Sequence, residues 1–299
     1  MITPKPLKKG DTVGLVSTAR KVNSEELKFS LELFESWGLK VELASNLYEV
    51  HHQFAGTDEQ RLADAQGFID SPDISAIICV RGGYGTVRII DELNFFPLVE
   101  NPKWICGYSD VTVLLNKLRK VGVECLHSPM PLGFADNTPG SLQSFRKALF
   151  GEDLKISCAP HALNRNGEAK GRLNGGNLSV LYSQMGSGTA LDLDGDILFI
   201  EDLDEYLYHI DRMMQNLKRN GYLDHISGLI IGGMTDMNDN KVPFGQSAEE
   251  IISEVSRSYN FPVCFGFPAG HGPDNHTLIF GRRAVLKVGD SVELTFENG

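Results

Sequence analysis

The chain has 299 residues, enough for two domains or one large one, and its hydrophobic and charged fractions of 41% and 22% are those of a soluble globular protein. The net charge of −11 and the pI near 5.2 argue against a nucleic-acid partner or an anionic membrane surface, because both favour proteins with a basic excess. A small molecule or a peptide is the expected ligand.

Cysteine usage and the N-terminus indicate the compartment. The five cysteines are odd in number and widely spaced, mostly within or beside apolar stretches, which is typical of reduced, buried thiols and not of disulfides or zinc ligands. The opening MITPKPLKKGDTVGLVSTA lacks a long apolar region and a cleavage site, and no apolar run approaches about 18 residues. We therefore expect a cytoplasmic protein that does not associate with membranes.

The first half of the chain alternates short apolar strands with amphipathic helices. The pattern predicts strands at TVGLVST (12–18), LKVELAS (39–45) and SAIICV (75–80), with helices over 25–38 and 58–70. Such alternation indicates a largely parallel sheet covered on both faces.

Two further units follow, CVRGGYGTVRIIDEL (79–93) and ICGYSDVTVLLNKL (105–118), each predicted as a strand, a tight turn and a helix. Ligands of open parallel sheets bind at the carboxyl ends of the strands. Both turns should lie at that edge.

Periodicity fades after Leu132, which predicts a domain over 1–135, a linker over 136–168 that holds a short helix near SFRKALFG, and a second domain over 169–299. The second domain is predicted to be a mixed α/β structure. Its expected elements are the strands DILFIED, GLIIGG and PVCFGF, the helices HIDRMMQNLKRNGYL and AEEIISEVSRSY, and a terminal hairpin at Gly289-Asp290.

Ser109 is the candidate nucleophile. A strand that turns abruptly into a helix exposes the residue at the turn beside the positive end of the helix. A serine that merely caps the helix would occupy the same position. The sequence leaves both interpretations open, and a catalytic serine also needs a base and an acid that orients the base.

His271 and Glu201 are the candidate base and acid. Of the eight histidines, His271 lies just beyond a predicted strand, between two glycines of FPAGHGPDN, although a simple turn histidine would look the same. Glu201 ends the apolar strand of DILFIEDLDEY, where a buried carboxylate without a partner would be costly. The acidic residues after it are typical of a solvated helix N-terminus.

Two sources of backbone N–H groups could stabilise an oxyanion: Asp110, directly after the serine, and the glycines of RGGYG (81–85). As a phosphate loop, RGGYG fits neither the G-x-G-x-x-G spacing nor a Walker motif. A zinc site from His271, Asp274 and His276 is disfavoured, because glycine and proline deny this segment the helix on which zinc-binding histidines are usually spaced.

Five motifs in order, RGGYG, GYSD, GGNLS, FIEDLDE followed by YHIDR, and GHGPDN, resemble those of the serine LD-carboxypeptidases, or muramoyltetrapeptide carboxypeptidases, over roughly 10–289. The resemblance implies a flavodoxin-like, class I glutamine amidotransferase-like N-terminal domain with a parallel sheet and a swivelling β/β/α C-terminal domain.

The resemblance also implies a site and an activity. It places the nucleophile at Ser109, the acid at Glu201 and the base at His271, with the N–H groups of Gly83 and Asp110 as the oxyanion hole. It implies no cofactor, a homodimer, and release of D-alanine from the cytoplasmic tetrapeptide of recycled cell wall.

A carboxypeptidase of net charge −11 needs a cation for the substrate's terminal carboxylate, and Arg81 and Arg88 flank the glycine loop. We expect one of them to bind it, unless both pair with surface acids such as Asp91 or Glu92.

Two other functions stay open. One branch of the family cleaves microcin C-type aminoacyl nucleotides, for which Tyr206 and Tyr208 could stack on the base. The second is a non-catalytic α/β ligand-binding protein, in which Ser109, Glu201 and His271 would not need to lie close together.

Overall fold

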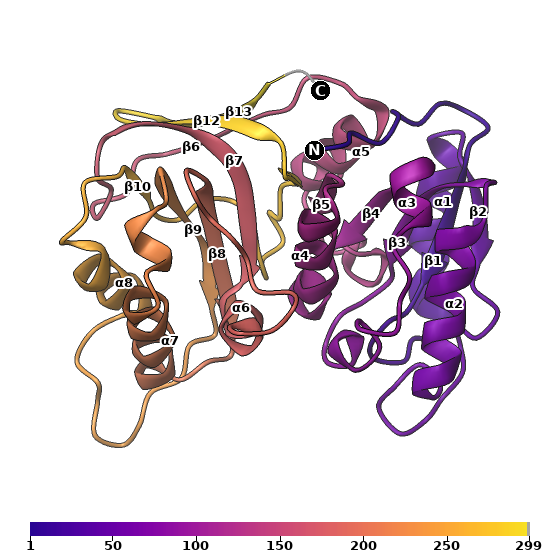
Figure 1. Cartoon of the computed structure of the whole chain (residues 1–299), viewed down its shortest axis with the longest axis horizontal. Coiled ribbons are helices and arrows are strands. Elements are labelled where there is room, and N and C mark those ends of the chain that lie inside the picture. The colour runs from indigo at the N-terminus through magenta and orange to yellow at the C-terminus, as the bar shows by residue number, and fades with distance from the viewer. Residues whose placement is uncertain (298–299) are drawn as a thin grey trace. The chain divides into compact units, whose positions relative to one another are not determined.

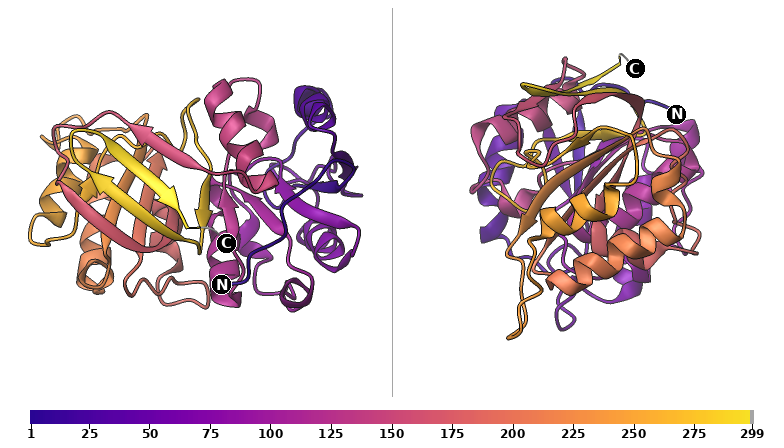
Figure 2. Two further views of the ribbon diagram at one scale, coloured as in Figure 1. Left: turned by 90° about the horizontal axis from the view of Figure 1, so that it is seen from above. Right: turned by 90° about the vertical axis from the view of Figure 1, so that its left-hand side faces the viewer.

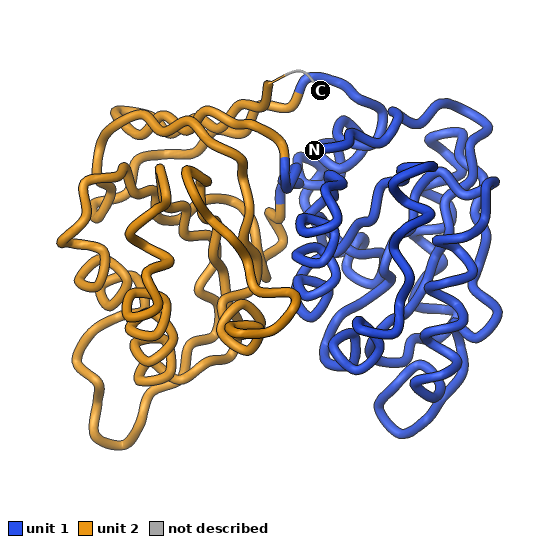
Figure 3. The backbone as a smooth tube through the Cα atoms, in the orientation of Figure 1, with its two compact units in different colours: residues 1–153, 276–281 blue, residues 154–275, 282–299 orange. Residues whose placement is uncertain are grey.

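The computed structural model describes residues 1–297 and divides into two compact units, distinguished by colour in Figure 3. Unit 1 comprises Met1–Asp153 and His276–Gly281, and unit 2 comprises Leu154–Asn275 and Arg282–Gly299. The division at Asp153 falls inside the expected linker. Helix α5 (Pro139–Phe150) belongs to unit 1 and strand β6 (Lys155–Cys158) to unit 2, so about half of that segment is regular structure.

Unit 1 is built on a six-stranded sheet in the order β11-β5-β4-β3-β1-β2. All neighbouring pairs are parallel except β11 with β5. The strands are β1 (Thr12–Val16), β2 (Lys40–Leu43), β3 (Ile74–Cys79), β4 (Trp104–Gly107), β5 (Cys125–His127) and β11 (Leu278–Phe280). The central strands β3 and β4 are almost completely buried, as a sheet covered on both faces requires.

The helices of unit 1 pack around this sheet, as Figure 1 shows. They are α1 (Lys28–Ser36), α2 (Asp58–Asp70), α3 (Pro97–Glu100), α4 (Thr112–Val121) and α5. Helix α2 begins with a capping box, in which Thr57 and Gln60 each bind the other's backbone N–H.

Unit 2 contains a seven-stranded mixed sheet in the order β10-β9-β8-β7-β12-β13-β6. Its strands are β6, β7 (Gly167–Asn177), β8 (Ile197–Leu203), β9 (Gly228–Thr235), β10 (Val263–Cys264), β12 (Arg283–Val288) and β13 (Val292–Phe296). Strand β7 joins two halves: its first six residues pair antiparallel with β12, and its last five pair in parallel with β8. The expected hairpin at Gly289-Asp290 is confirmed by the β12–β13 pairing.

Three helices cover the parallel half of this sheet: α6 (Leu178–Gln184), α7 (Leu207–Arg219) and α8 (Ala248–Ser256). Helices α7 and α8 lie side by side in Figure 1 and in the right-hand view of Figure 2. Leu198 and Ile200 of β8 belong to the apolar cluster beneath these helices. Because side chains alternate along a strand, Phe199 and Glu201 belong to the other face.

Two local expectations differ from the structure. The helix expected after RGGYG is a single 3₁₀ turn, Thr86–Arg88, which a hydrogen bond to Asp110 holds at its start. Residues 276–281, which the sequence assigned to the C-terminal domain, belong to unit 1, where strand β11 pairs with β5. None of the helices within residues 1–297 is both long enough and apolar enough to cross a bilayer.

Candidate active site

Ser109 lies in a strained turn between β4 and α4. Its φ of +61° falls in the left-handed region that residues other than glycine rarely adopt. Gly107 permits the turn, because a Cβ there would lie 2.9 Å from Cγ1 of Val111. Within residues 1–297, Ser109 provides no side-chain cap to α4 or to the 3₁₀ turn Ser109–Val111 that precedes it. The capping interpretation therefore has no support, and the turn presents the hydroxyl at the end of the sheet.

The glycine loop of RGGYG lies against this turn. A Cβ built on Gly82 would be 3.1 Å from Cβ of Ser109 and 3.4 Å from the backbone nitrogen of Asp110. The buried Asp110 side chain accepts a 2.9 Å hydrogen bond from the N–H of Thr86, which ties the end of the loop to the serine turn. Gly83 has a φ of +110°, a backbone conformation that glycine adopts without strain and other residues rarely adopt. Backbone N–H groups and the serine are thus neighbours within unit 1.

The two arginines expected to bind a carboxylate have partners in the structure. Arg88 makes two 2.9 Å hydrogen bonds from Nε to the carboxylate of Asp58, and its Nη2 binds the same group. Arg81 donates from Nη1 to the carbonyl oxygen of Lys21 at 2.9 Å. Neither arginine pairs with Asp91 or Glu92 among the described ion pairs, and Asp58 is the acid that occupies Arg88.

Glu201 and His271 form a hydrogen-bonded pair within unit 2. Oε2 of Glu201 lies 2.6 Å from Nδ1 of His271, and the glutamate side chain has no exposed surface. Burial lowers the pKa of His271, but the hydrogen bond to Glu201 and the negative charges of Glu201 and Asp202 outweigh it, so the pKa of the imidazole is raised above 6.5. The geometry is that of an imidazole held in one tautomer by a buried carboxylate.

Gly270 lets the histidine loop approach the glutamate. Its φ is +118°, and a Cβ there would lie 2.9 Å from Oε2 of Glu201. The N–H of Gly270 donates to the side-chain oxygen of Asn275 at 2.9 Å, which closes the loop around His271. The pairing therefore depends on a glycine directly before the histidine.

Asp202, the neighbour of Glu201, has a different environment. It accepts hydrogen bonds from Nδ2 of Asn177 at 2.8 Å and from the N–H groups of Ser179 and Leu203 at 2.9 Å each. Burial and the charge of Glu201 raise the pKa of Asp202 to about 7. Asp202 thus connects the ends of β7 and β8 to the start of α6, so its hydrogen bonds stabilise the fold.

Arg20 lies beside the glycine loop of unit 1, a contact that the sequence motifs did not reveal. It lies four residues beyond Val16, the last residue of β1, and Val16 pairs with Cys79, the last residue of β3. Gly83 lies four residues beyond Cys79, and a Cβ built on Gly83 would be 2.5 Å from Cδ of Arg20. The equal offsets from two paired strands were the available signal, but they require knowing that β1 and β3 are neighbours.

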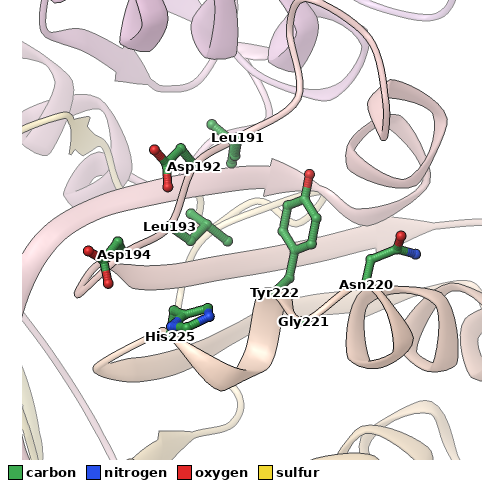
Figure 4. Close-up of a pocket in the computed structure, with 8 residues that line it drawn as sticks. All are labelled: Leu191, Asp192, Leu193, Asp194, Asn220, Gly221, Tyr222 and His225. Carbon is green, nitrogen blue, oxygen red and sulfur yellow. The ribbon is translucent and has the colours of Figure 1, made fainter.

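A separate cavity of about 440 Å³ occurs in unit 2, lined by 191–194 and by residues 220–222 and 225 (Figure 4). These segments precede β8 and β9, whereas Glu201 lies toward the carboxyl end of β8. Its carboxylates, Asp192 and Asp194, are exposed and form no buried charged group. Across residues 1–297, no three histidine, cysteine, aspartate or glutamate side chains group in a way that could hold a metal ion.

Comparison with known proteins assigns both halves of the chain. Residues 13–128 match the LD-carboxypeptidase N-terminal domain, and 170–286 match the LD-carboxypeptidase C-terminal domain. A probable murein peptide carboxypeptidase of Bacillus subtilis is 33% identical over 96% of this chain and 92% of its own length.

Two more relatives extend the comparison. The crystal structure of muramoyltetrapeptide carboxypeptidase from Oxalobacter formigenes matches with a TM-score of 0.88 and 27% identity, covering 95% of this chain and 98% of that one. The microcin C7 self-immunity protein MccF of Escherichia coli is 27% identical over 94% of this chain and 92% of its own length. The chain therefore belongs to the LD-carboxypeptidase family and is a serine-type carboxypeptidase, a hydrolase.

Proposed function

We propose that this enzyme releases the terminal D-alanine from murein tetrapeptide, with Ser109 as nucleophile, His271 as base and Glu201 as the acid that orients it. The observation that carries the chemistry is the 2.6 Å contact between Nδ1 of His271 and buried Glu201. When Nδ1 donates its proton to a carboxylate, the neutral imidazole must accept a proton at Nε2. A base in this tautomer is what a serine nucleophile needs.

The first half of the reaction forms an acyl-enzyme. Nε2 of His271 takes the Ser109 hydroxyl proton while the oxygen attacks the scissile carbonyl carbon. The N–H groups of Gly83 and Asp110 stabilise the negative oxygen, because they are fixed before the charge develops. The 2.9 Å bond between Thr86 and Asp110 supports this role, since it holds the loop to the serine turn.

The second half releases both products. His271, now protonated, gives its proton to the nitrogen of the leaving D-alanine, and Glu201 stabilises the imidazolium until then. Water then attacks the acyl-enzyme with His271 again as base, which frees the shortened peptide and restores Ser109.

An assay of D-alanine release tests this proposal. The purified protein is incubated with a murein tetrapeptide, and free D-alanine and the tripeptide product are quantified, with Ser109→Ala as the matched inactive control. Release by the wild type and its loss in Ser109→Ala are expected. No release from any L,D-tetrapeptide would contradict the proposed substrate.

A second candidate is hydrolysis of an aminoacyl nucleotide, and two observations favour testing it. One relative is the microcin C7 self-immunity protein named above. In addition, Tyr206 and Tyr208 are 43% and 40% exposed with ring centroids 5.5 Å apart, so aromatic surface is available for a base to stack on. Comparing kcat/KM for the tetrapeptide with that for an aminoacyl adenylate analogue decides between the two substrates.

We further propose that the enzyme acts in the cytoplasm on recycled cell-wall peptides, as a homodimer, without a cofactor and without nucleic-acid or membrane partners. The net charge of −11 supports the absence of nucleic-acid and membrane partners, because it disfavours binding to polyanionic surfaces. Light scattering coupled to gel filtration tests the dimer, and a monomer at assay concentrations would contradict it.

A further inference from the structure

The side chain of Arg20 lies over the glycine loop beside the candidate nucleophile. A Cβ built on Gly83 would be 2.5 Å from Cδ and 2.8 Å from Nε of Arg20, while one built on the adjacent Gly82 would be 3.3 Å from Oγ of Ser109. Two consecutive glycines therefore contact the serine on one side and an arginine on the other. All of these residues belong to unit 1.

The guanidinium of Arg20 has no hydrogen-bond or ion-pair partner within residues 1–297, and its side chain is exposed. Nearby arginines differ: Arg61 and Arg88 both bind Asp58, and Arg81 binds the carbonyl of Lys21. In a protein of net charge −11, Arg20 thus leaves an uncompensated positive charge beside the glycine loop. It has the chemistry to bind an anionic group of a ligand.

The proposed substrate places an anion at this distance. In a peptide cleaved at its last bond, the terminal carboxylate carbon is three bonds from the scissile carbonyl carbon, at most about 4 Å away. When the scissile oxygen binds the N–H of Gly83, the carboxylate must therefore lie beside the same loop. A cation that binds it has to contact that loop, as Arg20 does.

We propose that Arg20 binds the C-terminal carboxylate of the substrate and so makes this enzyme a carboxypeptidase; the inference rests on the peptidase function proposed above. Arg20 takes the role that the sequence suggested for Arg81 or Arg88. The planar guanidinium can bind both carboxylate oxygens at once, which also orients the leaving D-alanine.

Arg81 acts in this arrangement as a positioning residue. The segment around Arg20 is extended, since Ala55 donates to the carbonyl of Ala19 at 3.1 Å and Lys21 donates to the carbonyl of Gln53 at 3.0 Å. The bond from Arg81 to the Lys21 carbonyl holds this segment to the glycine loop. Because successive side chains of an extended segment point in opposite directions, the Lys21 side chain points away from Gly83.

The test compares a tetrapeptide that has a free C-terminal carboxylate with the same peptide carrying a C-terminal amide, and measures kcat/KM from the tripeptide product. The wild type should prefer the acid. Arg20→Gln should lower kcat/KM for the acid by about 10- to 150-fold and leave the amide nearly unchanged, so the preference disappears. Arg20→Lys should restore part of it, since the charge remains.

Two further variants separate binding from positioning. Arg81→Gln should lower kcat/KM for both peptides by a similar factor, because it moves the loop segment without removing the cation. Lys21→Gln removes the adjacent positive charge and should change neither value, which excludes a general effect of charge. Melting temperatures show whether each variant is folded.

Three outcomes would overturn the inference while leaving peptidase activity intact: equal cleavage of acid and amide by the wild type, an unchanged preference in Arg20→Gln, or an equal loss on both peptides in folded Arg20→Gln. Absence of tripeptide product from wild type with either peptide is a different result. It would overturn the proposed peptidase function, and this inference with it.

Discussion

His271 Nδ1 lies 2.6 Å from Oε2 of Glu201, a carboxylate that is completely shielded from solvent. The two residues are 70 positions apart in the chain, and the glycine that precedes the histidine brings them together. This contact sets the protonation state of the proposed base.

The pH dependence of hydrolysis should reflect the raised pKa of His271. A base must be neutral, so kcat/KM should rise with pH to a plateau, with a midpoint above 6.5. Glu201→Gln keeps a hydrogen-bond acceptor but removes the charge, so it should move the midpoint to lower pH and reduce the plateau. A wild-type midpoint at or below 6.5 would show that Glu201 does not govern this histidine.

The same pKa shift makes a prediction for stability. A histidine whose folded-state pKa is raised stabilises the fold by protonation, fully below its unfolded pKa near 6.5 and no longer once the pH has risen through the folded value. In the Ser109→Ala background, the stability lost on His271→Ala should be larger at pH 5.5 than at pH 9. Denaturant unfolding at both pH values measures this, and the reverse order would contradict the direction of the shift.

Glu201 and Asp202 are neighbours in sequence, but their substitutions should differ in kind. Glu201→Ala removes the partner of His271 and should lower kcat by about 10⁴-fold, as for the acids of comparable triads. Asp202→Ala removes the acceptor of three hydrogen bonds, of which the bond from buried Asn177 is fully shielded, and should mainly destabilise the protein, by about 1–3 kcal/mol. If folded Asp202→Ala loses as much kcat as Glu201→Ala, the assignment of the acid is wrong.

Gly270→Ala should disrupt the His271–Glu201 contact. An alanine at this position would have a strained φ, and its Cβ would lie 2.9 Å from Oε2 of Glu201. The free energy of unfolding should therefore fall by about 1–3 kcal/mol, and kcat should fall as well. Gly272→Ala is the matched control, because nothing lies within 4 Å of the Cβ position on the other side of the histidine. Equal effects of the two substitutions on kcat would argue against this role of Gly270.

Chelators should leave activity unchanged. The prediction follows from the side chains around His271, since the described residues include no group of three potential ligands. Activity is measured after prolonged incubation with EDTA and again after adding zinc. Loss with the chelator and recovery with zinc would require a metal-dependent mechanism.

The local features of this protein could be predicted from the order of its residues. Apolar periodicity predicted the parallel sheet, the second mixed sheet and the terminal hairpin, because helix and strand spacing follow directly from residue order. The segment GYSD indicated an abrupt turn at Ser109, and the structure gives that serine a φ of +61°. The burial of Glu201 could also be anticipated, since it continues an apolar strand.

Contacts between residues that are distant in the sequence could not be predicted and became visible in the folded chain. Pairing of β1 with β3 brings Arg20 to Gly83. Asp58, at the start of α2, hydrogen-bonds Arg88 in the turn after the glycine loop, so this arginine is already bound. Strand β11 likewise pairs with β5 of unit 1, although the segments on either side of residues 276–281 belong to unit 2. Such contacts depend on strand order and register between distant segments, which no local pattern encodes.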